Sequence, residues 1–127
     1  MKSGCILIVD DEPDIGRFIR SVAEMSGYDT HVVTDSMEFE AVYTAVTPGF
    51  IILDLAMPGR DGIELIRFLG EQKSQAQVVL ISGLDGRILE AARRLGKARG
   101  LNIVGIIPKP VRVAELRRFL GELLRAA

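Results

Sequence analysis

The 127-residue sequence predicts an α/β protein built on a doubly wound parallel β-sheet. Two observations support this fold class. Short apolar runs alternate five times with stretches whose apolar residues recur at helical spacing. One run, Phe50–Asp54, is apolar without interruption until its last residue, and Pro58 and Gly59 follow it closely. Such a strand is buried on both faces, which requires helices on both sides of the sheet.

The predicted elements follow one another along the whole chain. The strands cover residues 5–9, 28–33, 50–54, 78–82 and 103–108, and the more polar second strand is expected near an edge. Helices are expected over 13–26, from Asp35 to about Ala45, from Asp61 onward, over 85–99, and from Val113 to the end. Proline suits the first turn of a helix, as at residue 13. Asp35 and Glu38 have the spacing of a capping box, and Glu90 and Arg94 can pair along the fourth helix.

Pro108 constrains the order of the strands. A proline has no amide hydrogen to donate to a neighbouring strand, so the fifth strand is expected at an edge of the sheet. No linker or repeat divides the chain, which predicts a single domain over residues 1–127.

The composition is that of an ordinary soluble domain, with 48% hydrophobic and 26% charged residues. No stretch is long enough for a membrane span and no signal peptide opens the chain, so a cytoplasmic protein with no membrane partner is predicted. No direct nucleic-acid partner is expected either. The net charge of −1 hides an asymmetry, because residues 1–82 carry six basic and thirteen acidic residues and residues 83–127 carry ten basic and four acidic. The acidic half could serve a metal and the basic half an acidic partner, or both could be solvated helix faces.

Polar residues stand at the carboxyl ends of four predicted strands. Asp10 and Asp11 follow the first, Asp54 ends the third, Ser82 ends the fourth and Lys109 follows the fifth. Parallel strands bring these ends to one edge, where ligands bind in such sheets. Three carboxylates repel one another unless a cation lies among them, and an all-oxygen set suits Mg²⁺. Lysine and serine would stabilise phosphoryl oxygens, and a carboxylate nucleophile would give an aspartyl phosphate. The alternative is that Asp54 merely caps a helix.

This set of motifs resembles the receiver domain of two-component response regulators, along essentially the whole chain. Each motif alone is weak, but together, in this order and at strand ends, they are specific. The matching stretches are residues 8–12 (Ile-Val-Asp-Asp-Glu), 53–59 (Leu-Asp-Leu-Ala-Met-Pro-Gly) with Asp61 and Gly62, 81–83 (Ile-Ser-Gly) and 108–110 (Pro-Lys-Pro). The resemblance implies a flavodoxin-like (βα)5 fold with strand order 2-1-3-4-5.

The resemblance also implies roles for individual residues. Asp54 would be the phosphoacceptor, and Ser82 and Lys109 would bind the phosphoryl group. Mg²⁺ would be held by Asp10, Asp11, Asp54 and the backbone carbonyl of Ala56. The Lys109–Pro110 bond would be cis, and the phosphodonor would be a histidine kinase or a phosphotransfer protein. The domain would catalyse only its own phosphorylation and dephosphorylation.

The sequence departs from the family pattern in two places. Ile106 replaces the aromatic residue that usually stands three residues before the lysine and swings inward on phosphorylation. The fourth helix is expected to be lengthened over residues 87–101, where the chain most resembles receivers joined to EAL-type cyclic di-GMP phosphodiesterases. We therefore expect the signal to be a shift of the face made by the fourth helix, the fifth strand and the fifth helix. That face would contact an output domain or form a homodimer.

Two other functions are considered. A pseudo-receiver would bind partners without phosphorylation, and only Ile106 favours it. A phosphatase of the haloacid-dehalogenase type would need a second aspartate two residues after the nucleophile, where this chain has Ala56. A nucleotide-binding fold is disfavoured because no glycine-rich loop follows the first strand.

Overall fold

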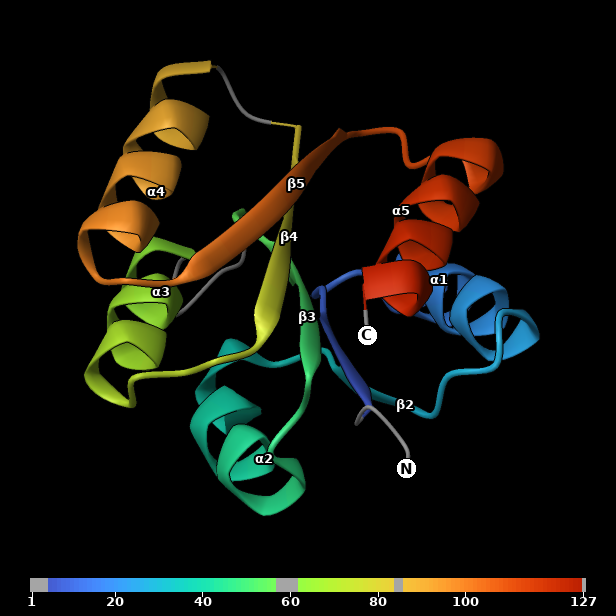
Figure 1. Cartoon of the computed structure of the whole chain (residues 1–127), viewed down its shortest axis with the longest axis horizontal. Helices are drawn as coiled ribbons and strands as arrows, with labels where there is room; N and C mark the ends of the chain where they lie inside the picture. Colours follow the sequence, from blue (N-terminus) through green and yellow to red (C-terminus); the bar gives the residue numbers. More distant parts are fainter. Residues whose placement is uncertain (1–4, 57–61, 84–85, 127) are drawn as a thin grey trace.

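Five parallel strands form one sheet in the order β2-β1-β3-β4-β5, which confirms the predicted flavodoxin-like (βα)5 topology (Figure 1). The structure is a computed structural model that describes residues 5–56, 62–83 and 86–126. The predicted starts of the third and fourth helices at Asp61 and Asp85 therefore lie outside the described residues, as does the 57–59 motif. The elements are β1 (Ile6–Val9), α1 (Pro13–Met25), β2 (Thr30–Val33), a 3₁₀ helix (Ser36–Glu38), α2 (Phe39–Val46), β3 (Phe50–Asp54), α3 (Gly62–Glu71), β4 (Gln77–Ser82), α4 (Gly86–Ala98), β5 (Asn102–Pro108) and α5 (Val113–Ala126).

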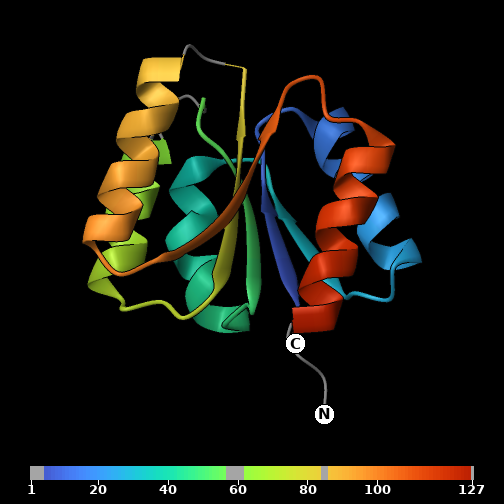
Figure 2. The same cartoon turned by 45° about the horizontal axis from the view of Figure 1, so that its top comes forward.

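The sheet lies between two layers of helices (Figure 2). Helices α1 and α5 cover one face, and α2, α3 and α4 cover the other. Because successive side chains of a strand point to opposite faces, β3 serves both layers. Ile51 and Leu53 pack in the cluster that includes residues of α2, α3 and α4, whereas Phe50 and Ile52 pack in the cluster that includes residues of α1 and α5. This two-sided burial explains the unbroken apolar run in the sequence.

Strands β2 and β5 form the edges of the sheet, as their composition predicts. Pro108 is aligned with Ser82 of β4. The amide that donates to the carbonyl of Ser82 is that of Lys109 (3.1 Å). Because amides of successive strand residues point to opposite sides, the nitrogen of Pro108 faces the open outer edge, where no donor is needed. A register shift in β5 aligns Val78 with Ile103 but Val79 with Gly105. Val104 is the extra residue of this bulge, and it is 44% exposed. Such an irregularity makes an edge strand a poorer template for pairing with another chain.

Helix α4 ends at Ala98, so the predicted extension to Leu101 is wrong. Gly100 has a φ of 79°, a left-handed conformation that glycine adopts without strain. Its amide donates to the carbonyl of Lys97 (3.0 Å), and the amide of Leu101 donates to the carbonyl of Gly96 (2.9 Å). This is a Schellman motif. Leu101 has helical spacing in the sequence, but it is buried in the connection to β5 instead.

Asp35 caps a different element from the one predicted. Its side chain accepts a hydrogen bond from the amide of Met37 at 2.9 Å, which opens the 3₁₀ helix. Helix α2 starts only at Phe39, and Glu38 precedes it without a side-chain cap. The pairing of Glu90 with Arg94 in α4 is confirmed, at 3.4 Å.

Gly62 begins α3 directly against the end of β3. Its amide donates to the carbonyl of Leu55 (3.2 Å). A Cβ at this position would lie 2.7 Å from the Cα of Leu55, and a rotation of side chains cannot relieve a clash with backbone. The glycine therefore allows the helix to approach the residue that follows Asp54.

We predict that Gly62→Ala lowers the free energy of unfolding by about 1–3 kcal/mol, the usual cost of forcing an extra methyl into a packed site. Urea unfolding followed by circular dichroism measures the change. Gly83→Ala is the matched control, because its Cβ would meet the side chain of Lys109 at an ordinary 3.5 Å. Equal stability of the two variants would show that the contact with Leu55 does not constrain the fold.

Candidate functional site

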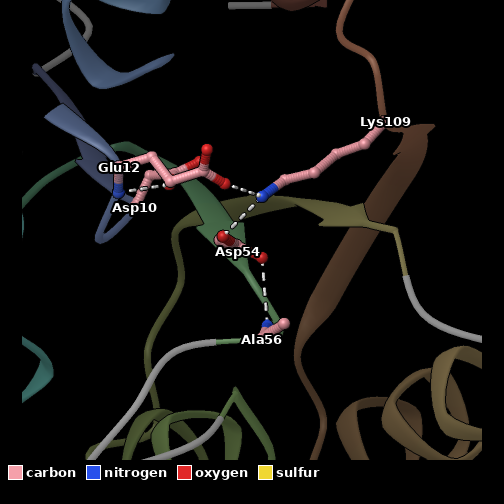
Figure 3. A network of polar contacts seen from close by, with 5 residues as sticks. All are labelled: Asp10, Glu12, Asp54, Ala56 and Lys109. Atoms are coloured by element: carbon pink, nitrogen blue, oxygen red, sulfur yellow. Dashed lines mark hydrogen bonds and ion pairs between the residues drawn. The ribbon is translucent and has the colours of Figure 1, made fainter. Parts of the chain in front are cut away.

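Asp54 lies at the carboxyl end of the central strand β3 and is completely buried. Both of its carboxylate oxygens have partners (Figure 3). Oδ1 accepts a hydrogen bond from the amide of Ala56 (3.0 Å), and Oδ2 accepts one from Nζ of Lys109 (3.0 Å). A buried carboxylate needs this compensation, because an unpaired charge in the interior is strongly unfavourable. Asp54 is therefore paired with a cation. Helix α3 begins only at Gly62, so Asp54 does not cap it.

Lys109 follows the edge strand β5 and reaches across the end of β4 to the central strand. Neighbouring strands are about 4.8 Å apart, so only a long side chain can span this distance. Its amide donates to the carbonyl of Ser82 (3.1 Å), and the predicted cis bond to Pro110 is present. Burial alone would lower the pKa of Lys109, but its hydrogen bonds to Glu12 and Asp54 and the charges of Asp54 and Asp10 raise that pKa above its ordinary value.

Asp10 lies beside Asp54 with its charge only partly compensated. Its Oδ1 accepts from the amide of Glu12 (2.9 Å). Its buried Oδ2 has no hydrogen-bond partner within the described part of the chain. Burial, aided by the charge of Asp54, raises the pKa of Asp10 to about 6. An orphaned buried carboxylate oxygen needs an explanation, and a cation bound among the acids would provide one.

The acidic cluster fits a hard divalent ion. Asp10, Asp11, Glu12 and Asp54 each place one carboxylate oxygen within 4.8 Å of the others. These are the oxygen ligands that Mg²⁺ prefers. Three of the four acids are those predicted as metal ligands. Nothing in the structure tests the assignment of individual ligands, and the carbonyl of Ala56 stays a prediction.

Ser82 ends β4 at the same edge and is buried. The residue before it, Ile81, is aligned with Asp54. The structure thus brings all the predicted site residues to one edge of the sheet. It also adds a residue that the sequence interpretation gave no role. Glu12 contacts Nζ of Lys109 at 3.0 Å (Figure 3). Its place directly after Asp10 and Asp11 was the only signal in the sequence.

Comparison with known proteins decides the family. The model of the response regulator receiver domain matches residues 6–120. The chain belongs to the response regulator receiver domain family. Receiver domains are phosphoacceptor signalling domains of two-component systems and not conventional enzymes. The family assignment therefore disfavours the haloacid-dehalogenase alternative, while phosphorylation of this particular chain stays a proposal.

Relatives and solved structures agree with this assignment. The aerobic respiration control protein ArcA of Escherichia coli K12 is 34% identical over 91% of this chain and 46% of its own length. The C4-dicarboxylate transport transcriptional regulatory protein DctD of Pseudomonas aeruginosa is 32% identical over 61% of this chain and 17% of its own length. A response regulator structure from Colwellia psychrerythraea has a TM-score of 0.83 and 32% identity, covering 99% of this chain and all of that chain. The receiver domain thus spans less than half the length of these two curated relatives.

The clustered acids should lower the stability of the metal-free domain. Asp10 holds its proton up to about pH 6 when folded, against an ordinary value of 3.8. As the pH rises through this window, the unfolded chain releases a proton that the folded domain still holds, so the free energy of unfolding falls. Above the window both states are ionised, and the loss persists.

We therefore predict that Asp10→Asn raises the free energy of unfolding by about 1–3 kcal/mol at about pH 7.5 in buffer with a metal chelator. The gain should shrink near pH 4, where Asp10 is protonated in the folded domain. Urea unfolding at the two pH values measures both effects. Asp14→Asn, at an exposed acid that pairs with Arg17, serves as the control. A gain that does not depend on pH would contradict the electrostatic explanation.

Proposed function

We propose that this receiver domain accepts a phosphoryl group on Asp54 from a histidine kinase or a phosphotransfer protein. The observation that carries the proposal is the pairing of the buried Asp54 carboxylate with Nζ of Lys109 at 3.0 Å, beside the orphaned oxygen of Asp10. The lysine supplies positive charge where phosphoryl oxygens would arrive, and the acids supply a place for a metal. No other described carboxylate combines complete burial with a lysine partner.

The reaction needs a nucleophile, charge compensation and a leaving group. A carboxylate oxygen of Asp54 forms a bond to phosphorus as the bond from phosphorus to the donor nitrogen breaks, and the donor histidine keeps that electron pair. Lys109 and the hydroxyl of Ser82 bind phosphoryl oxygens. Asp10, Asp11, Asp54 and the carbonyl of Ala56 would hold Mg²⁺, which supplies further positive charge to these oxygens when bound. Water later hydrolyses the acyl phosphate.

Asp54→Asn should abolish phosphorylation, because an amide is not a nucleophile at this site. The protein is incubated with Mg²⁺ and acetyl phosphate and its intact mass is measured. We expect the parent to gain the mass of one phosphoryl group and the variant to gain none. Glu71→Gln, an exposed acid in the last turn of α3, should behave as the parent does. A mass gain that survives Asp54→Asn would move the site elsewhere.

Asp11→Ala should remove most of the effect of Mg²⁺ on stability. A ligand that binds only the folded state raises the melting temperature, by an amount that grows with the ligand concentration relative to its Kd. We expect the parent to melt several degrees higher in millimolar Mg²⁺ and the variant to shift by less than about half as much. Asp14→Asn is again the matched control. An undiminished shift in Asp11→Ala would exclude Asp11 as a ligand.

A groove beside the site suits the phosphodonor protein. It has a volume of about 570 Å³ and runs from Glu12 and Lys109 of the site onto α1 and the connection between β5 and α5. The apolar residues in its lining are Ile15, Phe18, Pro110 and Val111. A protein bound in this groove would place its phosphohistidine next to Lys109, because Lys109 itself lines the groove. We propose this groove as the phosphodonor contact.

The output is proposed to be a shift of α4, β5 and α5. Ile106 packs half-buried against the cluster that includes residues of α3 and α4, and it has no aromatic ring to swing inward. Lys109 is tied by its amide to the end of β4. A Cβ at Gly105 would lie 2.0 Å from the ring of Phe119, so α5 follows β5 closely. Movement of Lys109 toward a phosphoryl group would thus reach both neighbouring helices.

Amide exchange with and without beryllofluoride, a phosphoryl mimic, tests this output. Protection changes should concentrate in α4, β5 and the adjoining part of α5. A small shift at the site is passed on to these elements if their packing has two alternative arrangements. Changes confined to the neighbours of Asp54 would favour the pseudo-receiver. Binding of the α4, β5 and α5 face to an output domain or to a second copy of this chain stays a prediction. The cytoplasmic location and the resemblance to receivers of EAL-type phosphodiesterases also stay predictions.

A further inference from the structure

Glu12 has a defined position and an unusual partner. Its backbone starts α1, because its carbonyl accepts from the amides of Ile15 and Gly16, both at 3.1 Å. Its amide is also used, since it donates to Oδ1 of Asp10. The backbone amide and carbonyl of Glu12 are therefore both fixed by hydrogen bonds, and only its side chain can change partners.

The side chain does not do what its position suggests. Glu12 is the N-cap residue of α1, yet it makes no side-chain cap. Its carboxylate instead contacts Nζ of Lys109 at 3.0 Å, across the site from β1 to the far end of β5. The side chain of Lys109 is 21% exposed and that of Glu12 is 57% exposed, so Glu12 covers the ammonium from the solvent side.

The ammonium is thus shared by two carboxylates. Asp54 contacts it from the buried side and Glu12 contacts it from the solvent side. Figure 3 shows the contacts from Nζ of Lys109 to both acids. A phosphoryl group on Asp54 would bring further negative charge to the same cation. Glu12 and the phosphoryl oxygens would then compete for Lys109, and the two anions would repel each other.

We infer that Glu12 is a positioning residue that holds Lys109 in its resting place and opposes its transfer to the phosphoryl group. The inference rests on the proposed function of Asp54. The contact would stabilise the unphosphorylated form relative to the phosphorylated form, and its loss would shift this equilibrium toward the phosphorylated form. Since an ion pair near the surface contributes little, the expected effect is only about two- to fivefold in affinity.

Three variants separate this contact from other roles of Glu12. Glu12→Gln removes the charge. Glu12→Asp keeps the charge but shortens the side chain by one methylene, and aspartate at this position caps the helix instead. Asp14→Asn removes a neighbouring exposed charge that pairs with Arg17 and not with Lys109. Binding of beryllofluoride in saturating Mg²⁺ is measured by calorimetry for the parent and each variant, and Mg²⁺ affinity is measured separately.

We expect Glu12→Gln and Glu12→Asp both to bind beryllofluoride about two- to fivefold more tightly than the parent, and Asp14→Asn to match the parent. If Glu12→Asp binds as the parent does, Glu12 acts only through its charge and the inference is overturned. A tenfold or greater loss of Mg²⁺ affinity in Glu12→Gln would make Glu12 a metal ligand, which also overturns it. A parent that binds Mg²⁺ but no beryllofluoride would overturn the proposed function together with this inference.

Discussion

The ion pair between Asp54 and Lys109 is the contact on which the site depends. Asp54 ends the central strand β3 and Lys109 follows the edge strand β5, so the pair depends on the observed order of the strands. The buried carboxylate needs a cation, and Lys109 reaches it because its own amide is fixed to Ser82 at the end of β4. The contact therefore depends both on the strand order and on the burial of Asp54.

The site keeps more negative charge than this one cation can balance. Asp10, Asp11, Glu12 and Asp54 converge on a small volume, and the buried oxygen of Asp10 has no partner among the described residues. Such an arrangement costs stability in the absence of a metal, because buried charge is poorly solvated. It is explained by function, since a bound divalent cation such as Mg²⁺ would relieve the repulsion that weakens the resting domain.

Much of the fold could be predicted from the sequence because local patterns and long-range packing agree. The apolar run before Asp54 and the proline at 108 identify a central and an edge strand without any coordinates. Strand order was available only from the family resemblance, because hydrophobic periodicity does not say which strands are neighbours. The end of α4 was mispredicted because Leu101 keeps helical spacing although the left-handed Gly100 stops the helix. The contact of Glu12 with Lys109 was missed because it joins residues 97 positions apart.

The central claim is that Asp54, and not one of the neighbouring acids, carries the phosphoryl group. Borohydride reduces an acyl phosphate to an alcohol and leaves free carboxylates unchanged, so it converts a phosphorylated aspartate to homoserine. The protein is phosphorylated with acetyl phosphate and Mg²⁺, reduced and analysed by peptide sequencing in a mass spectrometer. The account predicts homoserine at position 54 alone. Homoserine at position 10 or 11 would contradict it.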